Sequence, residues 1–217
     1  MPVAPAAPDT AADGSIRVDL REVIQALSDA LDLVGIDDVA HGKRVGIMAA
    51  QCARQMGLPA RETAFLFDLG LLHDIGTYFL LKQDGSDGEP LKFSKKRYIL
   101  HGLKGYEHLL DEGVDESIAQ FCRNHTGVGL TREDVVRQEL PLPPADYVPM
   151  NLEQEVVMYA DKFHSKSVPP KFLQVEAYTA RAERFGGENK QRWLDLVAKY
   201  GVPDIPALAE KYGMRMI

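Results

Sequence analysis

The chain has 217 residues, of which 45% are hydrophobic and 26% charged, a composition that supports one domain with a well-filled core. Its 25 basic and 32 acidic residues give a formal net charge of −7. This balance argues against a nucleic acid polymer as the main partner, because such binding depends on lysine and arginine displacing counterions from phosphates. No apolar run approaches the roughly twenty residues that span a bilayer, so we expect no membrane association.

The N-terminal stretch, residues 1–16, lacks the basic start and apolar middle of a signal peptide, and we expect a disordered tail. Two cysteines, Cys52 and Cys122, lie inside helical apolar patterns. They are typical of reduced core thiols in a cytoplasmic protein, and a disulfide between them is the alternative.

Helical spacing of apolar residues predicts a first helix at 18–34 and a second at 39–56. The second helix carries His41 four residues before Val45, on the same inward face and one turn into the helix. This histidine is therefore expected to point into the interior of the domain.

A third helix begins at Pro59 and runs through an apolar stretch to His73 and Asp74, and we expect Gly76 to end it. Burying an unpaired carboxylate beside an imidazole costs several kcal/mol, roughly, unless hydrogen bonds or a metal ion compensate. The pair at the end of this helix therefore needs partners from elsewhere in the chain.

The next helices each bring one such partner. A helix at 99–110 carries His101 near its start, and Gly105 one turn later allows a close approach by another helix. A helix at 115–125 ends at His125, a position that also suits the helix dipole. After a proline-rich connection, a helix at 152–165 sets Asp161 in an apolar run.

Three further helical stretches, at 171–185, 190–200 and 205–212, carry no cluster of ligand-type residues. Strand signals are almost absent, so the predicted fold class is all-α. We expect a helical core at 17–168 that holds the site and a C-terminal helical extension at 169–217 that packs on it. The remaining histidines, His108 and His164, are expected to be surface or half-buried residues.

Six polar residues thus fall on five predicted helices, with His73 and Asp74 together on one of them, near an end or on an inward face, and they supply four imidazoles and two carboxylates. This donor set suits two first-row divalent metal ions that share one aspartate. Three cations follow the ligands closely enough to bind a substrate phosphate, although each is also typical of a solvated surface charge. The candidate ligands are His41, His73, Asp74, His101, His125 and Asp161; the candidate phosphate contacts are Arg44, Lys104 and Lys162.

In this order the motifs resemble the six-ligand form of the HD-domain superfamily over residues 41–161, and His73-Asp-Ile-Gly76 is similar to that of the small stand-alone "HDIG" phosphohydrolases. The resemblance implies an HD-domain helical bundle around a metal centre. By position, His41, His73, Asp74 and Asp161 would hold a first metal ion; Asp74, His101 and His125 would hold a second, bridged by Asp74. The His125-Thr-Gly stretch is similar to that of bacterial diadenosine polyphosphate hydrolases of the same superfamily.

Two features differ from the cyclic-dinucleotide phosphodiesterase branch of that superfamily. Thr77 stands where that branch has a lysine, and Asn124-His125 where it has two histidines. The Gly-Tyr-Pro motif of the branch is also missing, so hydrolysis of cyclic dinucleotides is not expected.

The predicted function is metal-dependent hydrolysis of a phosphate ester or anhydride, with a small phosphorylated substrate such as a nucleotide, and with Asp74 and Lys104 as catalytic residues. One or two divalent ions (Fe, Mn, Zn, Mg, Co or Ni) are expected to activate the attacking water. Two alternatives stay open: a mixed-valent di-iron oxygenase of the same superfamily, and a metal- or nucleotide-binding module without turnover. The sequence leaves open whether the protein is a monomer or a homodimer.

Overall fold

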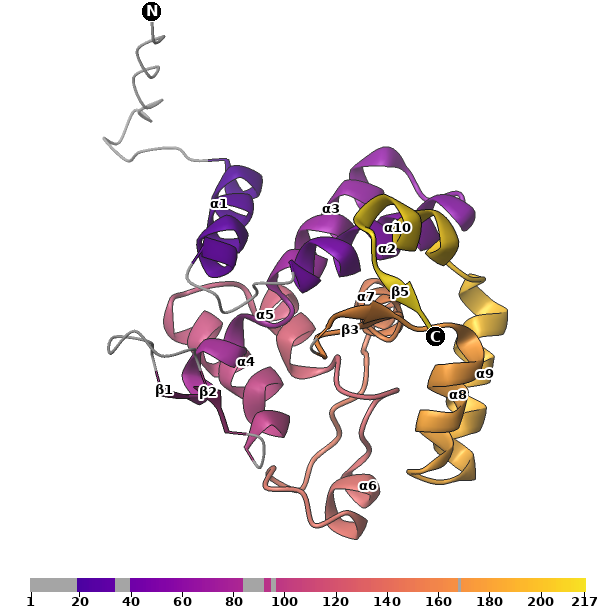
Figure 1. Ribbon diagram of the computed structural model, residues 1–217. Coiled ribbons are helices and arrows are strands. Elements are labelled where there is room, and N and C mark those ends of the chain that lie inside the picture. The colour runs from indigo at the N-terminus through magenta and orange to yellow at the C-terminus, as the bar shows by residue number, and fades with distance from the viewer. Residues whose placement is uncertain (1–18, 34–39, 84–91, 95–96, 168) are drawn as a thin grey trace, which may run out of the picture.

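The computed structural model describes residues 19–33, 40–83, 92–94, 97–167 and 169–217 (Figure 1). The tail predicted at 1–16 lies outside these residues. None of the helices within them combines the length and the apolar character needed to cross a lipid bilayer.

The predicted all-α fold class is confirmed, because nearly all of the regular structure in the described ranges is helical. Its α-helices are α1 (Leu20–Leu33), α2 (His41–Gln55), α3 (Ala60–Leu72), α4 (His101–Asp111), α5 (Glu116–Arg123), α6 (Arg132–Arg137), α7 (Leu152–Asp161), α8 (Val175–Glu183), α9 (Gly187–Tyr200) and α10 (Ile205–Tyr212). Two 3-10 helices are η1 (Ile75–Leu80) and η2 (Tyr98–Leu100).

Within the described ranges, short strands that were not predicted from the sequence form two small sheets. Strand β1 (Leu81–Gln83) pairs antiparallel with β2 (Lys92–Phe93). The second sheet has the order β3 (His164–Ser165), β4 (Lys171–Phe172), β5 (Arg215–Met216); β3 and β4 are antiparallel, and β4 and β5 are parallel. The C-terminal strand β5 therefore lies beside β4, the strand that precedes α8.

Two predicted helices are wrong at the ends that meet this sheet. The helix expected at 152–165 ends at Asp161, and the one expected at 171–185 begins at Val175. Pro169 and Pro170 lie between them; proline has no backbone N–H and restricts the residue before it to extended conformations, so the chain turns there instead of continuing as helix.

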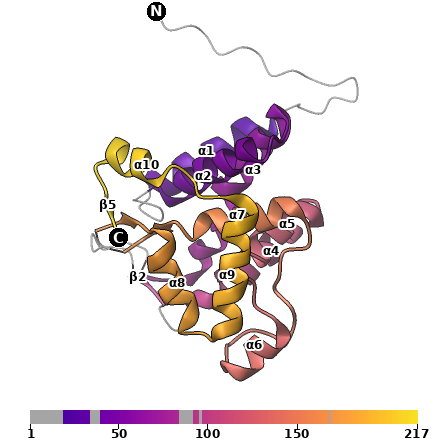
Figure 2. The same cartoon turned by 90° about the vertical axis from the view of Figure 1, so that its right-hand side faces the viewer.

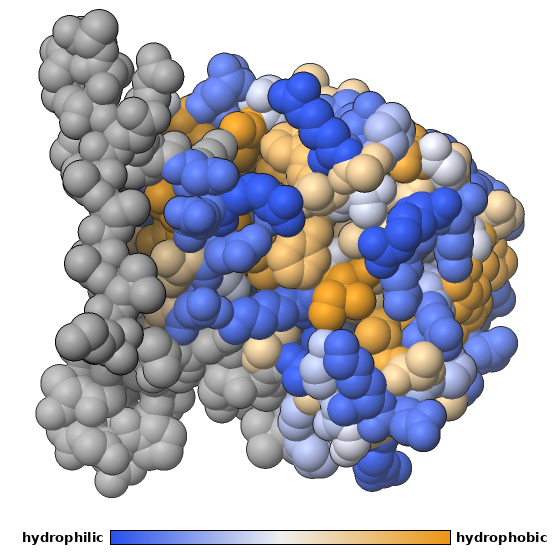
Figure 3. All heavy atoms as spheres, turned by 90° about the horizontal axis from the view of Figure 1, so that it is seen from above, coloured by the Kyte–Doolittle hydropathy of each residue, from blue (hydrophilic) through white to orange (hydrophobic). Residues whose placement is uncertain are grey.

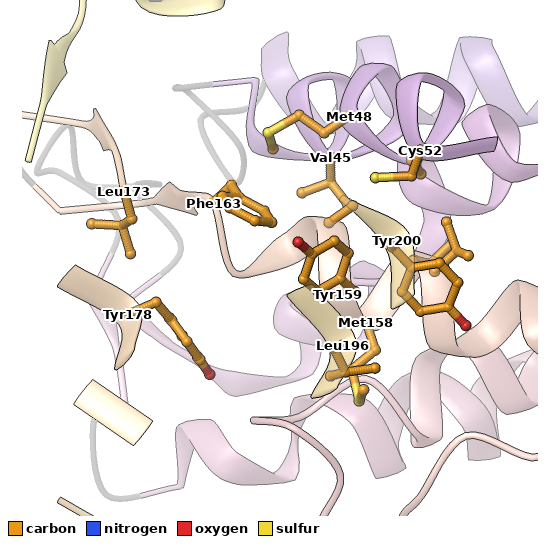
Figure 4. Close-up of a cluster of buried hydrophobic side chains, with 14 of the residues drawn as sticks. Val45, Met48, Cys52, Met158, Tyr159, Phe163, Leu173, Tyr178, Leu196 and Tyr200 are labelled. Atoms are coloured by element: carbon orange, nitrogen blue, oxygen red, sulfur yellow. The ribbon is translucent and has the colours of Figure 1, made fainter. Parts of the chain in front are cut away.

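The main core lies between α2, α7, α8 and α9 (Figure 4). Tyr159 of α7 lies at its centre, with its ring centroid 5.3 Å from that of Trp193 and 5.5 Å from that of Tyr200, both on α9. The C-terminal helices thus complete the core that α2 and α7 begin. The domain boundary predicted at 168 stays a prediction.

The helices surround α7, with α2 and α3 packed together on one side and α4 against α5 on another (Figures 1 and 2). Helices α8 and α9 pack against each other as a hairpin (Figure 2). Viewed from above, the described part of the surface shows hydrophilic side chains with hydrophobic patches between them (Figure 3). Cys52 and Cys122 are buried and form no disulfide, as expected for reduced core thiols.

Helix α6 lies in the stretch that was expected to be an irregular connection. The side chain of Asp134 holds this helix in place. The carboxylate of Asp134 accepts hydrogen bonds from Thr131, from Arg137 at 2.6 Å and from Arg192 of α9 at 2.8 Å. Burial disfavours the charged form, but the two guanidinium groups and Thr131 outweigh it and hold the pKa of Asp134 well below its usual range. This residue therefore links the connection to α9.

We expect Asp134→Asn to lower the free energy of unfolding at pH 7 by about 2 kcal/mol, because charged hydrogen bonds are lost. Because the pKa of Asp134 is lower in the folded state, its contribution is complete above the unfolded pKa of about 4 and is lost as the pH falls below that value. Urea unfolding at pH 7 and at pH 3 measures both effects. The variant and the wild type should therefore differ less at pH 3.

Glu133→Gln is the matched control, since Glu133 is exposed on the same helix, and it should change stability at neither pH. A destabilisation by Asp134→Asn that is equally large at both pH values would contradict the ionic explanation.

Candidate metal centre

All six predicted ligands meet in one place, and each lies at or just beyond the end of a helix. His41 is the first residue of α2, not one turn inside it, because Ala40 before it adopts a left-handed conformation with φ of 48°. The others occupy equivalent end positions: His73 and Asp74 between α3 and η1, His101 at the start of α4, His125 just after α5, and Asp161 at the end of α7.

One group of donors gathers around the Oδ2 atom of Asp74 and the Oδ1 atom of Asp161. His41 Nε2 lies 2.8 Å from Asp161 Oδ1 and 3.4 Å from Asp74 Oδ2. His73 Nε2 lies 3.6 Å and 3.2 Å from the same two oxygens. These four residues could therefore share one cation.

A second group faces the other oxygen of the same carboxylate. His101 Nε2 lies 3.3 Å and His125 Nε2 3.5 Å from Asp74 Oδ1. The two oxygens of Asp74 thus point to separate groups of imidazoles, which is the arrangement of a bridging carboxylate.

The backbone fixes the tautomer of three of the histidines. In each, Nδ1 donates a hydrogen bond to the carbonyl oxygen three residues earlier: His73 to Gly70 at 2.6 Å, His101 to Tyr98 at 2.6 Å, and His125 to Cys122 at 2.7 Å. A neutral imidazole with its proton on Nδ1 presents a lone pair at Nε2. All three therefore offer Nε2 to the centre.

These lone pairs fit a metal ion. The Nε2 atoms of His101 and His125 lie 2.8 Å apart, and two facing lone pairs repel each other unless a cation or a proton lies between them. Among the residues that the structure describes, the buried Nε2 of His73 has no hydrogen-bond partner. Imidazole nitrogens bind divalent metals such as zinc at about 2 Å, so donor atoms about 3 Å apart can share one ion.

The carboxylates make the side near His73 favourable for positive charge. Burial disfavours its protonated form, but the charges of Asp74 and Asp161 prevail and raise the pKa of His73 to about 10. Burial and the neighbouring His125 lower the pKa of His101 to about 3. A cation beside Asp74 and Asp161 is therefore well stabilised, and a second ion would meet an unprotonated His101.

The three predicted phosphate contacts lie in different surroundings. Lys162 is buried, and its ammonium group binds the Asp161 carboxylate and the His125 carbonyl oxygen, the latter at 2.9 Å. Lys104 forms an ion pair with Glu107 at 2.6 Å on the exposed side of α4. The guanidinium group of Arg44 lies 4.3 Å from the ring centre of Tyr212 in α10.

Sequence reasoning missed two residues beside the ligands. His164 was expected to be a surface or half-buried residue, but it is buried, with its Nδ1 atom 2.8 Å from Nδ1 of His41. Lys166 forms an ion pair with Asp74. Both follow α7 in a segment without apolar periodicity. Lys166 is marked only by its closeness to Asp161 in the sequence, and His164 by no pattern that predicts burial.

Gly76, which was expected to end the third helix, has a different role in the structure. Helix α3 ends at Leu72, before Gly76, which lies inside η1. A Cβ atom on Gly76 would overlap the carbonyl oxygen of His101 and the backbone nitrogen of Gly105. The close approach predicted for Gly105 is confirmed, because Gly76 is the backbone it approaches.

A protein-family model matches more than half of this chain. The family model described as "HD domain" matches residues 39–166, which span α2 to the end of β3 and include all six candidate ligands. Among solved structures, the HD domain of the L. monocytogenes phosphodiesterase PgpH shares the fold, with a TM-score of 0.51 at 15% identity over 86% of this chain and 98% of that one.

Two curated relatives are similar to this chain over different shares of their own length. An uncharacterized protein of Methanocaldococcus jannaschii is 39% identical over 146 residues, which cover 64% of this chain and 73% of the relative. The 3'3'-cGAMP-specific phosphodiesterase 1 of Vibrio cholerae is 48% identical over 59 residues, which cover 27% of this chain but only 14% of that enzyme. The second likeness is therefore local.

Proposed function

This chain belongs to the HD-domain family, and from that premise we propose that it is a metal-dependent phosphohydrolase that cleaves a phosphate ester or anhydride. A first ion would be held by His41, His73, Asp74 and Asp161. A second would be held by Asp74, His101 and His125, with Asp74 as the bridge.

One observation carries the proposal: the two oxygens of Asp74 face two separate groups of imidazoles. Two bound divalent ions would lower the pKa of a water and neutralise charge on phosphoryl oxygens. Asp74 and Asp161 supply the negative charge that keeps cations in place. Their side chains are 17% exposed while the imidazoles are nearly covered, so the centre opens to solvent on the carboxylate side.

The substrate we propose is a small phosphorylated molecule, with nucleotides as the first class. The local likeness to the Vibrio cholerae phosphodiesterase adds cyclic dinucleotides to the molecules to be tested. Because Thr77 and Asn124 differ from the residues of the cyclic-dinucleotide branch, we place cyclic dinucleotides below mono- and dinucleotides as candidate substrates. A catalytic role for Lys104 stays a prediction, since its ammonium group pairs with Glu107.

Metal analysis of protein purified without chelator, followed by a hydrolysis screen of mono-, di- and cyclic nucleotides, tests the proposal. We expect between one and two divalent ions per chain and phosphate release that a chelator abolishes and added metal restores. A mixed-valence iron signal in electron paramagnetic resonance together with oxygen uptake would replace the proposal with oxygenase chemistry. Full metal content without any turnover would indicate a binding module.

A second test concerns His164, which the geometry places behind His41. For His41 to bind metal through Nε2, its Nδ1 must carry the proton and donate a hydrogen bond to His164 Nδ1. We expect His164→Ala to weaken metal binding by roughly 10–100-fold, as is typical when the partner of a metal-bound histidine is lost. Calorimetric titration with Mn²⁺ measures the effect.

His164→Asn is the conservative variant, because its side-chain oxygen can accept the same hydrogen bond, and it should retain more affinity than the alanine variant. His108→Ala is the matched histidine control, and it should bind Mn²⁺ as the wild type does. Equal affinity of the His164→Ala protein and the wild type would remove the positioning role.

A further inference from the structure

Lys166 is the more exposed of the two lysines that pair with the carboxylates of the centre. It directly follows strand β3, and its ammonium group forms an ion pair with the Oδ2 atom of Asp74. The side chain is 31% exposed, against 17% for Asp74 and 6% for Lys162. An incoming molecule therefore meets Lys166 where the centre opens to solvent.

The position of this ammonium group conflicts with a metal ion in the first site. Asp74 Oδ2 is also the oxygen that lies 3.4 Å from His41 Nε2 and 3.2 Å from His73 Nε2. A divalent ion held by these donors would need the same oxygen, and two cations bound to one carboxylate oxygen repel each other strongly at low dielectric. Metal ion and ammonium group therefore compete for Oδ2.

The displaced ammonium group has a defined place to go. Its nitrogen lies 5.4 Å from the ring centre of Tyr98, within the range of a cation–π contact, and Tyr98 in turn stacks on His101 with ring centroids 4.8 Å apart. The aromatic face keeps the ammonium group at the opening of the centre. Released from its carboxylate, it becomes a positive charge beside the bound metal, with no other ion pair to an acidic residue within the described ranges.

We propose that Lys166 occupies the place of the first metal ion in the metal-free protein and, once metal binds, becomes the residue that holds a non-bridging oxygen of the substrate phosphate. This inference rests on the proposed function. A phosphate group is the complement of an ammonium beside divalent metal, because one of its oxygens can bind the metal while another accepts a charged hydrogen bond.

Two titrations of the full chain test the inference without any turnover. In the first, Mn²⁺ is added to metal-free protein; Lys166→Met should bind Mn²⁺ at least several-fold more tightly than the wild type, because the competitor is gone. In the second, inorganic phosphate is added to the Mn²⁺-loaded protein; Lys166→Met should bind it about tenfold more weakly, as the loss of one charged hydrogen bond implies.

Lys166→Arg should restore phosphate binding, since a guanidinium group also donates to phosphate. Lys190→Met is the matched control, because Lys190 pairs with Glu183 on the surface of α8 and α9, and it should leave both affinities unchanged. Weaker Mn²⁺ binding by Lys166→Met, or unchanged phosphate binding, would overturn the inference.

The outcome is separable from that of the proposed function. If both affinities change as expected but no phosphate ester is cleaved, the inference holds and the hydrolase proposal fails. If esters are cleaved and the Lys166→Met affinities equal those of the wild type, only the inference fails. A wild-type chain that binds neither Mn²⁺ nor any other of the expected divalent ions overturns both.

Discussion

Asp74→Ala is expected to abolish metal binding and phosphate-ester hydrolysis together. The substitution removes the one carboxylate that faces both groups of imidazoles, so neither ion keeps an anionic bridge. It also leaves the Lys166 ammonium group without its carboxylate. Elemental analysis should find less than a tenth of the wild-type metal content, and activity should fall by about 1,000-fold or more, as is typical when a group stabilising transition-state charge is lost.

Three further variants test whether the loss is specific to the metal ligands. His73→Ala should lose metal and activity as Asp74→Ala does, whereas His108→Ala should keep both, because His108 packs against Phe79 and not against the centre. Asp74→Asn keeps the shape and removes the charge, so it distinguishes loss of the ligand from loss of folding. Equal metal content in the Asp74→Ala, His73→Ala and His108→Ala proteins would remove the ligand assignment.

The six candidate ligands could be predicted because each is a polar residue in or beside an apolar helical pattern, a signal contained in a few neighbouring residues. His73 and Asp74, for example, directly follow the apolar run of α3. The same periodicity predicted most helices to within a few residues of their ends. It failed where no helix continues, as at the two-residue strands β3 and β4.

His164 and Lys166 could not be predicted because tertiary contacts place them. His164 lies on β3, which is fixed by pairing with β4, and β4 in turn pairs with the C-terminal β5. No short stretch of sequence encodes that arrangement. Helix α6 is different: Thr131 and Asp134 form a capping box, a local signal that marks the start of a helix and was overlooked.

Gly76 shows how a correctly noticed residue can be misinterpreted. A glycine near the end of a helix usually ends it, which is why Gly76 was expected to stop α3. The requirement for glycine comes instead from α4, whose first turn lies against η1 with almost no space between the backbones. This contact joins Asp74, two residues before Gly76, to His101, and so sets the distance between the two halves of the centre.

Gly76→Ala should therefore be among the most damaging single-methyl substitutions in the chain. Its Cβ atom would overlap the His101 carbonyl oxygen and the Gly105 nitrogen and lie 2.8 Å from the Gly105 Cα atom. These are backbone atoms, which cannot move aside as a flexible side chain would. We expect the free energy of unfolding to fall by about 3 kcal/mol or more in urea titration, and any folded protein to bind Mn²⁺ more weakly.

Alanine substitutions at two other glycines should have smaller effects on stability. Comparing them tests the close contact even if the Gly76→Ala protein does not fold. A Cβ atom on Gly105 would lie 3.0 Å from the Gly76 nitrogen and 3.1 Å from the Cys122 Cβ atom, a contact that small shifts relieve, so Gly105→Ala should cost less. A Cβ atom on Gly187, at the start of α9, would meet nothing within 4 Å, and Gly187→Ala should be neutral or slightly stabilising. If Gly105→Ala destabilised the protein no more than Gly187→Ala does, the backbones of η1 and α4 would not be in the close contact that holds Asp74 against His101.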